Sequence, residues 1–136
     1  MMRTIAMGEP GKTVRQLAAA VVETLNLVIE NVKPGRVAGD VARAASKGLA
    51  SLGSDAFFHG GYGYSVGLGF PPTWDEGLFS IAENVDGVLA PGMTFHLPIA
   101  VRIPGQCGVA LSETISVTES GCEVLSISKQ RELAVA

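Results

Sequence analysis

The sequence has few cysteines and histidines, which crosslink small proteins or bind metals, with two of each among 136 residues. Cys107 and Cys122 match neither a metal-ligand spacing nor a disulfide framework, so we expect both to be reduced structural residues. Lys and Arg number 10 against 13 Asp and Glu, and this lack of basic excess argues against a nucleic-acid partner. Charged residues are only 17% and mean hydropathy is +0.34, which suggests apolar surface shared with another subunit or another part of the chain.

Long apolar runs are also missing. Arg15, Glu23, Asn26 and Glu30 interrupt the longest apolar stretch, so no segment of about 18 apolar residues is long enough to span a membrane. The first residues are followed at once by Gly8–Lys12, which leaves no room for the apolar core of a signal peptide, and a cytoplasmic location is expected. The length predicts a single domain, and 47% hydrophobic residues are enough for a packed core.

Two helices are predicted in the first part of the chain. From Thr13 to Val32 apolar residues recur at helical spacing, with polar residues on the other face. Thr13 is the expected N-cap, Gln16 completes a capping box, and Pro34 follows the end of the helix. A second, alanine-rich helix is expected from about Val37 to Leu52. We expect these helices to form a hairpin that covers one side of a sheet.

The last third of the chain predicts strands at Met93–Ile103, Val109–Thr118 and Glu123–Ile127. Side chains alternate between the two faces of a strand. In the middle strand this alternation puts Glu113 in a row that is otherwise apolar, with Val109, Leu111, Ile115 and Val117. A carboxylate there is costly unless it is paired, hydrogen-bonded or bound to a metal, so Glu113 is a candidate site residue. The alternative is a strand-edge glutamate that Arg102 or another cation neutralises.

Three further residues are candidates with a structural alternative. His96 alternates away from the aliphatic row of its strand and has a pKa suited to proton transfer, although histidines in sheets also serve as structural hydrogen-bonding groups. His59 precedes a glycine-rich segment and either lines a pocket or caps a loop. Trp74 follows two prolines and either lines an apolar slot or fills the core.

Several short motifs occur in one recognisable order. They are Gly8-Glu9-Pro10, Lys33-Pro34-Gly35, Gly63-Tyr64-Ser65-Val66-Gly67, Pro91-Gly92-Met93-Thr94-Phe95, Ser112-Glu113-Thr114 and Val117-Thr118-Glu119-Ser120-Gly121. Their order resembles the pita-bread family of methionine aminopeptidases, prolidases and creatinase, and is most similar to its ectoine hydrolase and Xaa-Pro peptidase-like branch. The resemblance covers nearly the whole chain, residues 1–136. It implies an α+β fold, the second half of a pita-bread domain, with two helices packed on a curved antiparallel sheet.

Metal-dependent members of that family hold two metal ions with two aspartates, one histidine and two glutamates. The resemblance places the histidine position at Tyr64, the first glutamate at Pro98, the second at Glu113, and both aspartates before Met1. One carboxylate and a phenol do not replace a dinuclear cage of oxygen and imidazole ligands. The resemblance therefore implies no cofactor, and manganese or cobalt is expected only if the chain is a metallopeptidase.

The implied function is a metal-independent hydrolase of the creatinase and ectoine hydrolase type, acting on a C–N bond of a small amino-acid-derived or cyclic amidine substrate. Glu113 and His96 would transfer protons or act as nucleophile, while Tyr64, His59 and Trp74 would shape the substrate pocket. Two alternatives remain: a metal-dependent Xaa-Pro aminopeptidase or dipeptidase, and an inactive half-domain that acts only by association. The expected partners are a small-molecule substrate and either a second copy in a homodimer or a missing amino-terminal half, with no nucleic acid and no membrane.

Overall fold

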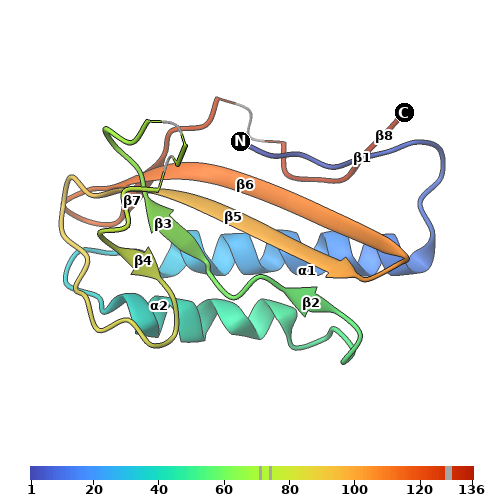
Figure 1. The fold of residues 1–136 in the computed structure, drawn as a ribbon, viewed down its shortest axis with the longest axis horizontal. Helices are drawn as coiled ribbons and strands as arrows, with labels where there is room; N and C mark the ends of the chain where they lie inside the picture. Colours follow the sequence, from blue (N-terminus) through green and yellow to red (C-terminus); the bar gives the residue numbers. More distant parts are fainter. Residues whose placement is uncertain (71, 74, 128–129) are drawn as a thin grey trace.

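Two helices pack on one face of a curved, mainly antiparallel sheet in the computed structural model, which describes residues 1–70, 72–73, 75–127 and 130–136 (Figure 1). The helices are α1 (Lys12–Asn31) and α2 (Ala38–Ala45), and a 3-10 turn, η1 (Ser46–Leu49), continues from α2. The predicted helical hairpin on one side of a sheet is confirmed, and with it the α+β class.

The main sheet has the strand order β4-β3-β5-β6-β7, and β2 pairs with β5 outside this path. Its strands are β2 (Phe57–Phe58), β3 (Gly63–Ser65), β4 (Ser80–Ile81), β5 (Thr94–Ile103), β6 (Cys107–Val117) and β7 (Cys122–Val124). A separate parallel pair joins β1 (Ile5–Ala6) to β8 (Ala134–Val135), so the two ends of the chain run side by side (Figure 1). The long hairpin of β5 and β6 is the centre of the sheet.

The boundaries of the helices differ from the prediction in two places. Gly11 is the N-cap of α1 in extended backbone, no side chain caps the helix, and Thr13 already lies in its first turn, so the predicted capping box is wrong. The second helix ends at Ala45 instead of Leu52 and tightens into η1. Gly48 explains the tightening, because its backbone lies so close to Thr24 of α1 that a Cβ atom would be 2.7 Å from the Thr24 Cα.

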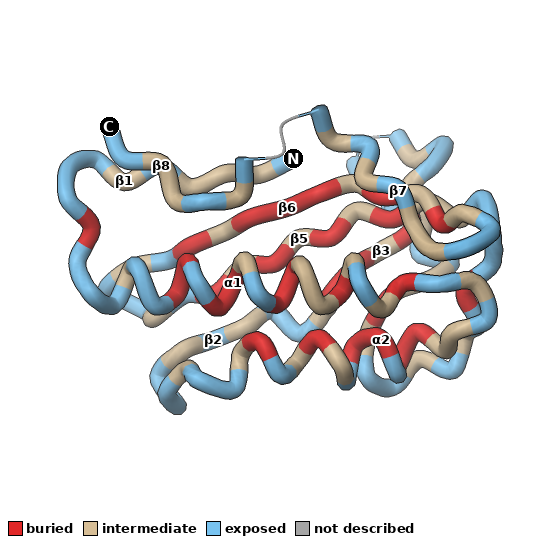
Figure 2. Tube along the Cα trace, turned by 180° about the vertical axis from the view of Figure 1, so that it is seen from behind, coloured by how far each residue is buried: buried red, intermediate tan, exposed pale blue. Residues whose placement is uncertain are grey.

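The core lies between α1 and the helix side of β5 and β6 (Figure 2). Its fully buried side chains include Leu17, Leu25 and Val28 of α1 and Phe95, Leu97, Ile99 and Ile115 of the sheet. Burial alternates along β5 from Thr94 to Val101, where every second residue is buried and the residues between are partly exposed. One face of the sheet is therefore sealed by helices, and the opposite face, called here the open face, remains for function.

Neither cysteine is bridged, and both are partly buried. The Cys122 thiol donates a hydrogen bond to the Ile29 carbonyl at 3.3 Å, and burial raises its pKa. Within the described part of the chain, no helix has the length and apolar character needed to cross a membrane.

Candidate functional site

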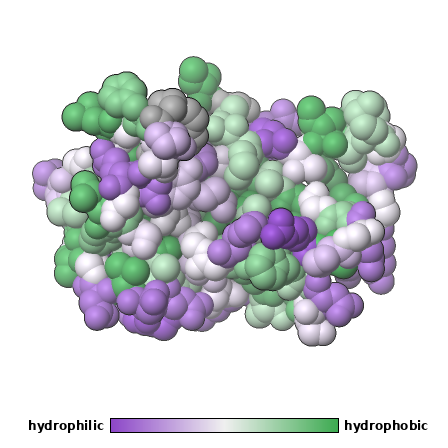
Figure 3. All heavy atoms as spheres, viewed as in Figure 1, coloured by the Kyte–Doolittle hydropathy of each residue, from purple (hydrophilic) through white to green (hydrophobic). Residues whose placement is uncertain are grey.

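The open face carries a row of polar side chains across three strands. The register pairs Tyr64 of β3 with His96 of β5, His96 with Thr114 of β6, and Pro98 with Ser112. Directly opposed residues project from the same face of a sheet, so these five residues share the face away from the helices. In Figure 3, which views the molecule as Figure 1 does, hydrophilic and hydrophobic residues are interspersed over the surface.

Tyr64 and His96 form the centre of this row. Their ring centroids are 5.3 Å apart with the ring planes inclined by 56°, and both residues are partly buried. Burial, followed by the positive amino terminus, lowers the pKa of His96 from 6.5. Burial, followed by the negative charge of Asp75, raises the pKa of Tyr64. At neutral pH the pair is therefore a neutral imidazole beside a protonated phenol.

Glu113 lies on the other face, opposite Leu97 and among apolar residues of the core, as the alternation predicted. Its side chain is fully buried, and its Oε1 accepts hydrogen bonds from Arg3 Nη2 at 2.7 Å and from Arg131 Nε at 3.3 Å. Arg102 is not a partner, because its guanidinium lies over the Phe57 ring, 5.0 Å from the centroid. Glu113 is thus neutralised by two arginines other than Arg102, which is the structural alternative expected from the sequence.

Glu113 and His96, which were predicted to carry the chemistry together, lie on opposite faces of the sheet. Pro98 faces Ser112, and Glu113 points to the opposite side of β6. Ser112, which sequence reasoning did not single out, is the β6 residue that shares the open face with Pro98. Strand alternation was the available signal, because residues of one site must lie on the same face of the sheet.

Ser112 is fully buried because the amino-terminal segment lies against it. The Met2 amide donates to Ser112 Oγ at 2.6 Å, and the Ser112 amide donates to the Met2 carbonyl at 3.1 Å. Two residues further on, the Thr4 hydroxyl donates to the Ala110 carbonyl and accepts from the Ala110 amide, at 3.0 and 2.9 Å. Residues 2–4 therefore run antiparallel beside β6, as the register of these bonds requires.

His59 lies away from the pair of Tyr64 and His96. It lines a shallow pocket of about 240 Å³ together with Thr4, Arg102 and the small residues Ala100, Gly108 and Ala110. Ala100 is four residues from His96 along β5, which is about 13 Å of extended strand. The structure thus places His59 near the far end of the sheet. Trp74, the remaining predicted pocket residue, lies outside the described residues.

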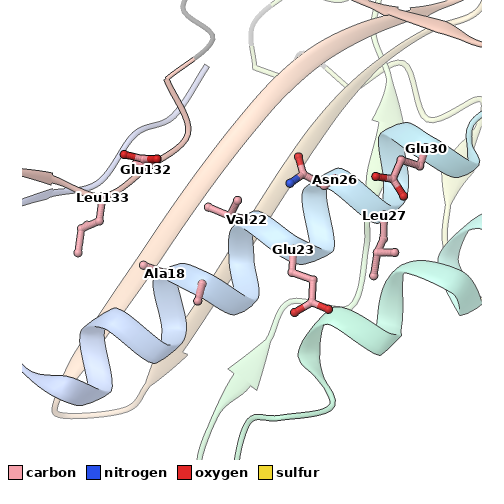
Figure 4. A pocket seen from close by; sticks show the side chains of 9 residues that line it. Ala18, Val22, Glu23, Asn26, Leu27, Glu30, Glu132 and Leu133 are labelled. Atoms are coloured by element: carbon pink, nitrogen blue, oxygen red, sulfur yellow. The ribbon is translucent and has the colours of Figure 1, made fainter.

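A larger groove, about 550 Å³ in volume, runs along the solvent side of α1 (Figure 4). Leu133 and Glu132 of the carboxy-terminal segment form one wall, and Ala18, Val22 and Leu27 of α1 form much of the other. The groove is mostly apolar with carboxylates on its rim, and the helices separate it from the open face. Its polar lining consists of Glu23, Glu30, Glu132 and Asn26, and it contains neither histidine nor tyrosine.

The side chains on the open face do not fit the two-metal site of the metal-dependent family members. Tyr64, His96, Ser112 and Thr114 provide one phenol, one imidazole and two hydroxyls, while Pro98 has no side-chain donor. Across the residues with a described position, no three His, Cys, Asp or Glu side chains are grouped to hold a metal ion. Hard divalent cations require several oxygen or imidazole ligands, which these residues do not supply.

Comparisons with known proteins give the family context. The model of metallopeptidase family M24 matches residues 1–119. An ectoine hydrolase from Halomonas elongata is 34% identical over 128 residues, which cover 93% of this chain and 31% of that protein. The predicted resemblance to this branch is confirmed.

Solved structures support the same fold. Dipeptidase PepE from Mycobacterium ulcerans and an Xaa-Pro dipeptidase from Bacillus anthracis both match with a TM-score of 0.86 and 28% identity. Each match covers 98% of this chain, and 34% and 36% of the two dipeptidases respectively. The chain therefore spans about a third of the length of the relatives it matches.

Proposed function

The chain belongs to metallopeptidase family M24, and on this premise we propose that it provides the carboxy-terminal half of a metal-independent hydrolase for a C–N bond in a small amino-acid-derived substrate. The observation that carries the proposal is the pair of Tyr64 and His96 on the open face. Beside this pair stand Pro98 and Ser112, neither of which offers a carboxylate. The similarity to ectoine hydrolase supports a cyclic amidine as the substrate class.

The chemistry follows from the protonation states of the pair. Hydrolysis of a C–N bond requires a base that takes a proton from water and an acid that gives one to the leaving nitrogen. His96 is neutral at pH 7 because burial lowers its pKa, so its unprotonated nitrogen accepts the proton of water and then returns it to the leaving nitrogen. Tyr64 keeps its proton because burial raises its pKa, and its hydroxyl is suited to donate a hydrogen bond to negative charge on the reacting centre.

A metal-dependent dipeptidase is the second candidate function. The similarity to two solved dipeptidases favours it, and the family takes its description from metal-dependent members. The donor set of the open face speaks against it, because Tyr64, His96, Pro98 and Ser112 provide no carboxylate. Metal-dependent activity would need most of its ligands from outside the 136 residues.

The loop between β3 and β4 exposes apolar side chains. Leu68, Phe70 and Leu78 lie in the loop between β3 and β4 and are 85%, 76% and 80% exposed. Glu76 closes this loop by accepting a hydrogen bond from the Leu68 amide at 2.8 Å. Exposed apolar side chains on a loop with internal hydrogen bonds support a docking surface. We propose that an amino-terminal half or a second copy of the chain packs on it, and light scattering over a range of concentrations distinguishes the two.

A substrate panel tests the function. A protein that contains this chain together with an amino-terminal half is incubated with ectoine, creatine and an Xaa-Pro dipeptide, each in EDTA and each with added Mn²⁺. The proposal predicts turnover of ectoine or creatine in EDTA, with a loss of about 100-fold or more in His96→Gln, as is typical for removal of a general base. Glu123→Gln, at an exposed residue of β7, is the matched control.

Two outcomes of the panel contradict the proposal. Cleavage of the Xaa-Pro dipeptide only, and only with Mn²⁺, would establish the metallopeptidase. Absence of any turnover, together with a stable self-associated form in light scattering, would favour a half-domain that acts by association.

A further inference from the structure

We propose that Glu113 is a positioning residue, which acts through Arg3 to hold residues 2–4 against β6 and so fixes Ser112 on the open face. The inference rests on the proposed function only in treating the open face as the reacting surface. It gives Glu113 a role without contact to the substrate, consistent with its position on the helix side of the sheet.

Glu113 is the centre of a polar cluster that joins four segments of the chain. Its carboxylate is fully buried in β6, and the side chains of Arg3 and Arg131 are 20% and 25% exposed. Arg131 also donates to Asn26 Oδ1 of α1 at 2.7 Å. The amino-terminal and carboxy-terminal segments therefore meet β6 at one carboxylate oxygen, and α1 is joined to this cluster through Arg131.

Arg3 links this carboxylate to the backbone of neighbouring segments through hydrogen bonds. Besides its bond to Glu113, it donates to the carbonyls of Met2 and Ser112 at 2.8 and 2.7 Å and to the carbonyl of Gln130 at 2.8 Å. A guanidinium has five donors in a rigid plane, so these bonds fix the segments relative to one another. Among these bonds the one to Glu113 joins two charged groups, so the carboxylate contributes strongly to the orientation of the guanidinium.

The backbone that Arg3 holds reaches the open face directly. The side chains of Met2 and Thr4 flank Arg3 and project to the other side of their segment. The backbone amide of Met2 donates to Ser112 Oγ, and the Met2 carbonyl accepts from the Ser112 amide. The carbonyl of Ser112 meanwhile accepts from Arg3. Ser112 is thus bonded through its amide, carbonyl and hydroxyl groups to residues whose position depends on the ion pair of Glu113.

The negative charge is what this role requires. Glu113→Gln keeps the shape of the side chain but places a neutral amide, with donors of its own, before two guanidinium groups. Charge-assisted hydrogen bonds are about twice as strong as neutral ones, so the clamp on Arg3 weakens while core packing is preserved. Loss of order should then be local to residues 2–4 and Ser112.

Amide hydrogen exchange measured by NMR tests this inference on the 136-residue chain without any substrate. In Glu113→Gln we expect the Ser112 amide, which donates to Met2, to exchange at least tenfold faster than in the wild type. Amides in the middle of α1 should change less than threefold. Arg3→Met should reproduce the effect and serves if Glu113→Gln does not fold, while the exposed Glu123→Gln should change neither region.

Two results would overturn the inference. Equal acceleration at Ser112 and throughout α1 would show that Glu113 contributes only to overall stability. An unchanged Ser112 amide in Glu113→Gln, or in Arg3→Met, would show that the ion pair does not hold the segment. Since the readout is exchange and not turnover, failure here leaves the proposed function standing, and failure of the substrate panel leaves this inference standing.

Discussion

Removal of the buried carboxylate should lower stability by an amount that the geometry of its two ion pairs predicts. In Glu113→Leu the apolar side chain fits the surrounding core, but two guanidinium groups lose their charged partner. Breaking a buried ion pair by removing one partner costs about 3–5 kcal/mol. The arginine side chains are 20% and 25% exposed and retain some water, so we expect a loss near the lower end, about 3 kcal/mol.

A double-mutant cycle divides this loss between the two arginines. The Arg3 contact, at 2.7 Å, has the length of a strong charge-assisted bond, whereas the Arg131 contact is 3.3 Å. We expect a coupling energy of about 2 kcal/mol between Glu113 and Arg3 and about 1 kcal/mol between Glu113 and Arg131, within the range for residues in one network. Urea unfolding followed by the circular dichroism of the helices measures both.

The exposed Glu123→Leu is the control for this cycle and should change stability by less than about 0.5 kcal/mol. Additive effects of the Glu113 and Arg3 substitutions would refute the reasoning, because additivity means that the two side chains do not interact. A larger coupling energy with Arg131 than with Arg3 would contradict the expectation that the shorter contact is the stronger one.

Three further predictions concern packing and pH. Gly48→Ala should destabilise the chain by several kcal/mol in urea unfolding, since the added Cβ would meet the backbone of Thr24 at 2.7 Å; a loss under about 1 kcal/mol would contradict this contact. Leu97→Ala should cost about 2–5 kcal/mol in the same assay, because Leu97 is fully buried in the core, and a near-neutral result would place it elsewhere. Burial lowers the pKa of His96, so the neutral side chain contributes stability that is present above pH 6.5 and lost as pH falls through the lowered value. The urea midpoint of the wild type should therefore fall more between pH 7 and pH 5 than that of His96→Gln. Equal changes in the two midpoints would disprove the shift.

The fold was predictable where hydrophobic periodicity is regular. The helical spacing from Thr13 to Val32 predicted α1, and strict alternation predicted β5 and β6 with small differences at their ends. The end of the second helix was not predictable, because it depends on the contact of Gly48 with Thr24, which are far apart in the sequence. A contact of this kind leaves no local pattern.

The candidate site was predictable in part, for a related reason. Parity along β6 correctly placed Glu113 in the apolar row, and parity along β5 placed His96 on the opposite face. The partners of Glu113 were not predictable, since Arg3 and Arg131 come from opposite ends of the chain, which the pairing of β1 with β8 brings side by side. Family motifs alone gave Glu113 a role on the wrong face, and the register of the β5–β6 hairpin corrected it.

The most direct test of the central claim is the pH dependence of kcat/KM for the substrate found in the panel, measured in EDTA for the wild type and for His96→Gln. We predict that the wild type loses activity as pH falls through the lowered pKa of His96, below 6.5, because the protonated imidazole no longer accepts a proton from water. His96→Gln should be slower by about 100-fold or more and should lack this acidic limb. Equal kcat/KM values and identical pH profiles for the two proteins would contradict the assignment of His96 as the base.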